Sequence, residues 1–221
     1  GLAVVRARRS CPLARTLLVD DVLVPDERRN DVIYFDPSHL ERVMGLNMLE
    51  YDERFPEQKT FVVNELFSIF QKLYGAVPES MGPMFEQYVR NALLLLLEDM
   101  PNEPTTLMEV PRIFTDPEYR KRKLARIKNT TVIDFWEKEA AQAGGDASLQ
   151  NITPYITSKF SNFIANDYMR VIIGQETSSF DFRAMMDEGK ILLVNLSKGQ
   201  IGDMNAGLLG MIFVGKILMA A

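Results

Sequence analysis

Two short apolar segments, far apart in the chain, have the composition of buried β-strands. Residues 31–37 read DVIYFDP, in which β-branched and aromatic residues lie between two aspartates and a proline ends the segment. Residues 190–196 read KILLVNL, and their apolar side chains follow one another without alternation, as in a parallel sheet. The long stretch between them shows mainly helical spacing, and a structureless loop of that length would be improbable. We therefore expect an α/β fold in which a partial parallel sheet carries a large all-α insertion domain.

Proline, glycine and apolar spacing predict the helices. Pro56 opens a helical pattern that runs to Tyr74, where Gly75 and Pro78 end it. The next helix, over residues 84–100, is apolar nearly all round, and such a helix is buried. Shorter helices are predicted over residues 106–115, from residue 116 onward, and over residues 132–142, 152–165, 181–187 and 204–221.

These patterns divide the chain into four parts. Residues 1–24 are interpreted as a frayed or non-native N-terminal segment, because the first 19 residues carry four arginines and no acid. Residues 25–50 form the first part of a sheet-bearing core, residues 51–168 the all-α insertion, and residues 169–221 the continuation of the core. The chain starts with glycine and ends inside an apolar helical pattern without a stop signal. We therefore expect an excerpt of a longer protein.

Composition excludes several classes of function. The formal net charge of -5 excludes a uniformly basic nucleic-acid-coating protein, although it allows a local basic patch. The single cysteine, Cys11, cannot form an internal disulfide, and the single histidine, His39, cannot build a His-cluster metal site, so no metal site is expected. A reducing compartment, the cytoplasm, fits best. The apolar residues 206–221 are interpreted as a buried helix, because glycines and Lys216 interrupt them far short of the ~18 residues of a membrane span.

The common nucleotide-binding motifs are absent from the chain. Neither the P-loop signature G-x-x-x-x-G-K-[ST] nor the dinucleotide fingerprint G-x-G-x-x-G occurs. Gly210, Gly215 and Lys216 approach the P-loop spacing, but Ile217 stands where Ser or Thr must bind magnesium. These glycines lie within an apolar helical pattern, so helix packing explains them better than phosphate binding.

A candidate nucleotide-proximal site follows the second predicted strand. Ser197, Lys198 and Gly199 lie where this strand ends and a helix begins, and open α/β sheets bind ligands at the carboxyl ends of their strands. Lys198 could reach a phosphate there, and the alternative is a tight turn with an exposed lysine. Arg170 is a further candidate, because it could donate to a phosphate across a subunit interface. The alternative for Arg170 is a structural or surface arginine.

A basic run provides a candidate DNA-binding face. Its positive charges could meet phosphates in salt-dependent contacts, and the alternative, equally supported, is a solvated helix face. The candidate residues are Arg120, Lys121, Arg122, Lys123, Arg126 and Lys128.

Two groups of segments resemble one known family. The first group is residues 29–37 with residues 45–50 (GLNMLE), and the second is residues 172–175 (IIGQ), 180–182 (FDF) and 190–199 (KILLVNLSKG). Their order and spacing resemble the conjugative coupling-protein and HerA-like branch of P-loop ATPases, which is related to the ATPases of type IV secretion. The resemblance covers about residues 25–221.

The resemblance implies a RecA-like parallel sheet, formed by residues 25–50 and 169–221 and interrupted by an all-helical domain. It also implies a ring, usually hexameric, which uses ATP and Mg²⁺ bound between subunits to move DNA or a protein substrate. The family's Walker A lysine and Walker B acidic pair are missing from these 221 residues. We therefore predict that this chain alone neither binds ATP tightly nor hydrolyses it, although the resemblance implies that the parent protein is an ATPase.

Three functions remain open from the sequence. The first is a fragment of an ATP-driven DNA-translocating motor in the cytoplasm or at the cytoplasmic face of the inner membrane. The second is a non-enzymatic helical DNA- or protein-binding module of a secretion or conjugation apparatus. The third is a scaffold within an oligomeric ring.

Overall fold

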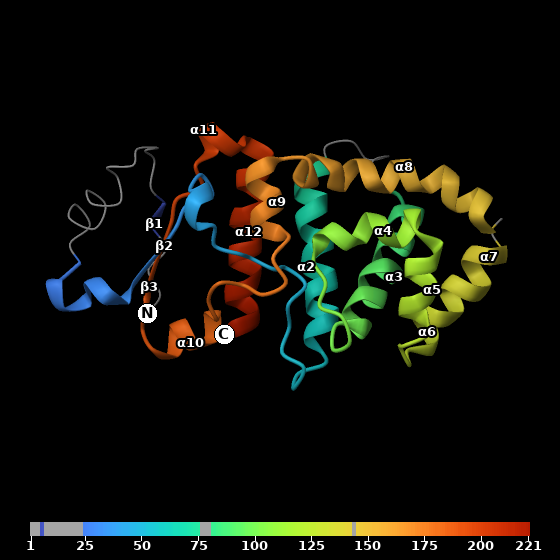
Figure 1. Ribbon diagram of the computed structural model, residues 1–221, viewed down its shortest axis with the longest axis horizontal. Helices are drawn as coiled ribbons and strands as arrows, with labels where there is room; N and C mark the ends of the chain where they lie inside the picture. The colour runs from blue at the N-terminus through green and yellow to red at the C-terminus, as the bar shows by residue number, and fades with distance from the viewer. Residues whose placement is uncertain (1–4, 7–23, 76–80, 143–144) are drawn as a thin grey trace.

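The computed structural model describes residues 5–6, 24–75, 81–142 and 145–221, so most of the predicted N-terminal segment 1–24 lies outside the described residues. Helices account for 67% of the structure and strands for 4%. The strands lie at one end of the long axis, and helices fill the rest of the molecule (Figure 1).

The prediction of an α/β fold with a partial RecA-like sheet is wrong, because the sheet is too small. β2 (Val32–Phe35) and β3 (Ile191–Val194) pair in parallel over four residues, and β1 (Val5–Arg6) pairs with β3 over only two. The strands stay short because their neighbours end them. The 3-10 helix η1 (Asp26–Asp31) precedes β2, and Pro37 follows it. Before β3, Gly189 adopts a left-handed turn (φ 64°), and every other element of the described chain is helical.

The two longest predicted helices of the insertion are confirmed. α2 (Gln58–Tyr74) ends at Gly75, as predicted, and α3 (Pro83–Asp99) begins with a proline, which is well suited to the first helical turn. α3 is buried along most of its length, as its run of leucines predicts. Phe70 of α2 packs against Phe85 of α3 with ring centroids 6.4 Å apart.

Several shorter helices complete the helical region beyond α3. Pro111 does not interrupt the predicted helix over residues 106–115, because it occupies the first turn of α4, where no backbone donor is lost. A π-helical turn, η5, interrupts the helix that contains Trp136. The elements are η4 (Leu107–Glu109), α4 (Val110–Thr115), α5 (Pro117–Leu124), α6 (Thr130–Asp134), η5 (Phe135–Glu139), α7 (Ala140–Gln142) and α8 (Gly145–Ile164).

The remaining helices lie close to the strands in the sequence, after β2 and on either side of β3. The remaining elements are η2 (Leu40–Arg42), α9 (Asp167–Ile173), α10 (Phe182–Asp187), α11 (Lys198–Ile201) and α12 (Asp203–Ala220). α12 stands between the strands and α2 (Figure 1), and Phe213 meets Phe35 of β2 edge to face, with ring centroids 4.8 Å apart. Among the described residues, α12 is the one helix whose length and mean hydropathy of 1.4 would suffice to cross a membrane.

One hydrophobic core runs through both ends of the molecule. The same cluster of buried side chains includes Phe35 and Leu192 of the strands, Leu66 of α2 and Trp136 at the far end of the helical region. The helices of residues 51–168 therefore share their core with the strands.

Candidate functional site

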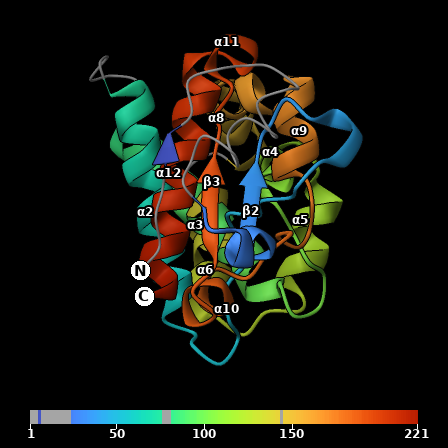
Figure 2. The ribbon, with the colours of Figure 1, turned by 90° about the vertical axis from the view of Figure 1, so that its left-hand side faces the viewer.

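Polar side chains gather at the carboxyl ends of β2 and β3. Because the two strands are parallel, they end at the same edge, near α11 (Figure 2). Asp36 directly follows β2, and Asn195 and Ser197 follow β3. This edge is where parallel sheets most often bind ligands. We call Tyr34, Asp36, Ser38, Asn195 and Ser197 the strand-edge cluster.

The Asp36 carboxylate is the centre of the strand-edge cluster. Its Oδ1 accepts hydrogen bonds from Ser197 Oγ (2.6 Å), Ser38 Oγ (2.6 Å) and Ser38 N (2.9 Å). Its Oδ2 accepts from Asn195 Nδ2 (2.9 Å) and from the Tyr34 hydroxyl (3.2 Å). Burial pushes the pKa of Asp36 upward, but the hydrogen bonds from Ser197, Ser38 and Asn195 outweigh burial and hold the pKa below its ordinary value.

Ser197 adopts a backbone conformation that favours glycine. Its φ is 43°, and it is the one non-glycine residue with positive φ in the described part of the chain. Such a conformation is strained and persists where surrounding contacts enforce it. Here the enforcing contacts are the Ser197 Oγ bond to Asp36 and the bond from Ser197 N to Asn195 Oδ1 (3.1 Å).

The strained turn leads directly to Lys198. Lys198 is the first residue of α11, and its ammonium lies 3.0 Å from the carboxylate of Asp203 with both side chains exposed. Exposed ion pairs of this kind contribute little to stability, so Lys198 can exchange Asp203 for an anionic ligand at small cost. Gly199 follows and is also exposed.

The chemistry available at this edge is anion binding. Five donors already occupy the Asp36 carboxylate, which leaves it poorly suited to act as a general base or a metal ligand. The described residues also contain no group of three or more His, Cys, Asp or Glu side chains that could hold a metal ion. Lys198 supplies a mobile positive charge, which is the side chain's usual role toward phosphate.

Arg170, the other nucleotide-proximal candidate, lies on α9. Its side chain is 54% exposed and pairs with Asp167 of the same helix at 2.9 Å. In the described structure, no hydrogen bond or ion pair joins Arg170 to residues 197–199. The structure therefore does not join the two candidates into one site.

Several cations of the basic run, in α5 and just after it, form ion pairs with acidic residues of the same chain. Lys123 and Asp99 both have side chains with 0% exposure, and Lys123 Nζ lies 2.8 Å from Asp99 Oδ2. Arg126 Nη2 contacts both Asp99 (2.6 Å) and Glu103 (2.5 Å). We call Asp99, Glu103, Lys123 and Arg126 the helical ion cluster. Lys123 presents no charge at the surface.

The other members of the basic run differ in their surroundings. Arg122 lies 3.3 Å from Glu103, and Arg120 donates to the carbonyl of Ile113 (2.8 Å) while its guanidinium lies 5.3 Å from the Trp136 ring centroid. Lys121 and Lys128 are exposed, and within the described residues neither forms an ion pair. They are the two members of the run best placed to meet a phosphate.

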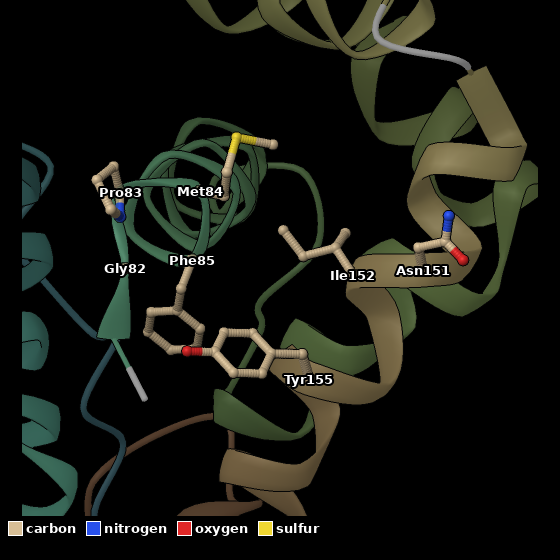
Figure 3. Close-up of a pocket in the computed structure, with 7 residues that line it drawn as sticks. All are labelled: Gly82, Pro83, Met84, Phe85, Asn151, Ile152 and Tyr155. Carbon is tan, nitrogen blue, oxygen red and sulfur yellow. The ribbon is translucent and has the colours of Figure 1, made fainter. Parts of the chain in front are cut away.

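An apolar pocket lies between the start of α3 and α8 (Figure 3). It encloses about 520 Å³ and has few polar atoms in its walls. Met84 stands over it with 49% of its surface exposed, while the rings of Phe85 and Tyr155 meet edge to face at 5.9 Å. Its lining residues are Gly82, Pro83, Met84, Phe85, Asn151, Ile152 and Tyr155.

The sequence predicts Ser197, Lys198 and Gly199 as candidates but does not point to Asp36 and Asn195, which hydrogen-bond to Ser197. Asp36 and Asn195 lie at the ends of the two predicted strand segments and directly follow β2 and β3 in the structure, and that position was the available signal. Comparisons of the chain with protein-family models, with curated proteins and with solved structures give no match.

Proposed function

We propose that this chain is a phosphate-binding part of an ATP-driven DNA-translocating motor of the conjugative coupling or HerA-like type. In this proposal the chain contributes binding, and the residues that carry out phosphoryl transfer belong to the rest of the motor. The proposed setting is a ring in the cytoplasm or at the cytoplasmic face of the inner membrane.

One observation carries the proposal. Asp36 holds the left-handed turn at Ser197, and this turn places exposed Lys198 at the carboxyl edge of the two parallel strands. The turn at Ser197 fixes the position of the backbone, and exposed Lys198 beside it supplies a positive charge. This combination suits phosphate recognition. The segments that resemble the family, FDP and NLSKG, are the segments that build this edge.

Equilibrium binding of a fluorescent ATP analogue tests the proposal. We expect weak binding that Lys198→Ala reduces roughly tenfold, the size of one charge-assisted hydrogen bond. Lys121→Ala is the matched control, because it removes an equally exposed lysine from α5. Equal losses in the two variants would contradict a specific site. Magnesium-dependent turnover by this chain alone would contradict the division between binding and phosphoryl transfer.

A second candidate, a non-enzymatic protein-binding module, is favoured by the apolar pocket between α3 and α8. Exposed Met84 at this pocket is the kind of side chain that adapts to a protein partner. Binding of a purified relaxase, measured by calorimetry, tests this candidate. Met84→Glu should abolish that binding and Lys198→Ala should preserve it. Val214→Glu, at an exposed apolar residue of α12, is the control substitution, and an equal loss there would reject the pocket as the cause.

A further inference from the structure

A second cavity lies at the other end of α12 from the strand-edge cluster. It encloses about 780 Å³ between residues 50–58, residues 178–183 and the last turns of α12. Pockets of this size accept small organic ligands. Its walls combine four aromatic rings, from Tyr51, Phe55, Phe180 and Phe182, with the buried amine of Lys216.

Lys216 is the unusual group in this cavity. Its side chain is only 6% exposed, and its Nζ donates a hydrogen bond to the backbone carbonyl of Glu50 (2.6 Å). The nearest carboxylate oxygen, also of Glu50, lies 4.0 Å away, beyond hydrogen-bond distance. A lysine ammonium has three N–H donors, so two of them lack an acceptor among the described residues. A buried charge in this state is costly until it is paired.

Burial of the Lys216 amine changes its pKa. Burial lowers the pKa of Lys216 to about 8, and the Glu50 carboxylate opposes this effect only in part. The other charged groups near the amine are already engaged or exposed. Arg54 forms an ion pair with Asp52, and Arg183 forms one with Asp187. Asp181 caps the N-terminus of α10. The charged groups that line the cavity, besides Lys216, are Glu50, Asp52, Arg54, Glu57, Asp181 and Arg183. The neighbouring helix α2 carries Lys59, which pairs with Glu98, Glu65, which lies against Gly215, and Lys72.

The walls provide a complementary apolar surface. Phe55 is a large apolar side chain at the cavity, and 48% of it is exposed. Phe180 and Phe182 lie against each other with ring centroids 5.0 Å apart. Aromatic walls of this kind favour a flat apolar ligand, which can bind by edge and face contacts.

We propose that this cavity binds a carboxylate carried on an aromatic body, with Lys216 as its cationic anchor. The two carboxylate oxygens supply acceptors for the two unused N–H donors of the amine. The aromatic body fills the space between Phe55, Phe180 and Phe182. This site lies at the other end of α12 from the phosphate-binding edge and does not depend on it.

Calorimetric titration with 4-phenylbutyrate and its uncharged analogue 4-phenylbutyramide tests the proposal at pH 7. The carboxylate should bind the chain at least about tenfold more tightly than the amide, because only the carboxylate forms charge-assisted hydrogen bonds. Lys216→Met, which keeps an apolar side chain of similar length, should remove this preference. Lys190→Met is the matched control, because Lys190 pairs with Asp31 outside the cavity, and the preference should survive there.

A pH series on the unaltered chain keeps the test independent of whether Lys216→Met folds. The pKa of Lys216 lies at about 8, so carboxylate affinity should fall several-fold between pH 7 and pH 9 while amide affinity stays constant. Equal affinities of acid and amide at pH 7 would overturn the proposal. So would a preference for the acid that survives in Lys216→Met or does not change with pH.

Discussion

The helical ion cluster and the strand-edge cluster each surround a carboxylate with hydrogen-bond donors, but the donors are mainly charged in the first cluster and neutral in the second. At Asp99 the cations Lys123 and Arg126 donate beside the Asn102 amide, so positive charges that are conspicuous in the sequence are neutralised inside the fold. At Asp36 the donors are hydroxyls, an amide and a backbone N–H, and the adjacent Lys198 stays at the surface.

This difference shows that a basic residue in the sequence need not present its charge at the surface of the fold. The basic run of α5 suggests a DNA-binding face, but its core member Lys123 ties α5 to the end of α3. A single lysine after a strand is a weaker sequence signal, yet Lys198 stays at the surface, where its ion pair with Asp203 joins two exposed side chains. Burial of the ion pair therefore separates Lys123, which is fixed inside the fold, from Lys121, Lys128 and Lys198, which remain exposed.

The largest expected effect comes from breaking the helical ion cluster. Asp99→Ala removes the closest partner of the fully buried ammonium of Lys123 and leaves only Glu103 at 3.7 Å. Loss of a partner from a buried ion pair typically costs about 3–5 kcal/mol of unfolding free energy. Urea denaturation followed by circular dichroism measures this loss. Asp134→Ala, which removes an exposed partner of Lys138, should change stability by less than about 1 kcal/mol.

A double substitution sharpens the interpretation. Asp99→Leu combined with Lys123→Met replaces the buried pair by apolar side chains and should recover most of the stability lost in Asp99→Ala. If the double variant is as unstable as the single one, an unpaired buried charge is not the cause of the loss.

An intermediate effect is expected at the strand edge. Asp36→Ala removes the main acceptor of the buried Ser197 and Asn195 side chains and of half-buried Ser38, and we expect a loss of about 1–3 kcal/mol. The same urea titration measures it. Phosphate binding should fall along with stability, because the turn at Ser197 loses its support. Unchanged ATP-analogue affinity in a folded Asp36→Ala variant would show that Asp36 does not position Lys198.

The Asp36 carboxylate also predicts a pH dependence. The pKa of folded Asp36 lies below its ordinary value, so its contribution to stability is present above about pH 4 and is lost as pH falls through the folded pKa. In Asp36→Asn this contribution is absent at every pH, so its unfolding free energy should fall less than that of the unaltered chain between about pH 5 and pH 2. Parallel profiles for the two proteins would contradict the role of these hydrogen bonds.

The smallest expected effect concerns DNA. Any contact of α5 and its C-terminal loop with DNA should depend on Lys121 and Lys128, because the other cations are engaged. Replacing both lysines by alanine should weaken binding of a DNA duplex and reduce its salt slope by up to about 2, one unit per phosphate contact. Anisotropy across a salt series measures this change. Arg122→Ala, next to Glu103, should change the slope less, and an equal change would restore the whole basic run as a candidate face.

The helices were largely predictable from the sequence, and the sheet was not. Prolines and glycines mark helix ends through local backbone chemistry, so Pro83 and Gly75 locate the ends of α3 and α2 well. The strand segments were located correctly, but strand pairing is a long-range property. Local composition does not reveal how many further strands join the pair, and the expected larger sheet was wrong.

The same limit applies to the candidate sites. Lys198 was predicted as a candidate because it lies just after a predicted strand, whereas the bond from Ser197 to Asp36 joins residues far apart in the chain. Pairing of Lys123 with Asp99 is likewise a contact between two helices. Its one local signal was the set of acidic residues at the end of α3, which includes Glu98, Asp99 and Glu103.

A residue-resolved NMR titration of the unaltered chain with Mg·ATP tests the central claim most directly, namely that the strand edge is the phosphate-binding surface. The account predicts progressive shifts of the backbone amides of Ser197, Lys198 and Gly199, with the amides of Lys121 and Lys128 unchanged. Shifts confined to the basic run, or no shift at residues 197–199 at saturating nucleotide, would contradict it.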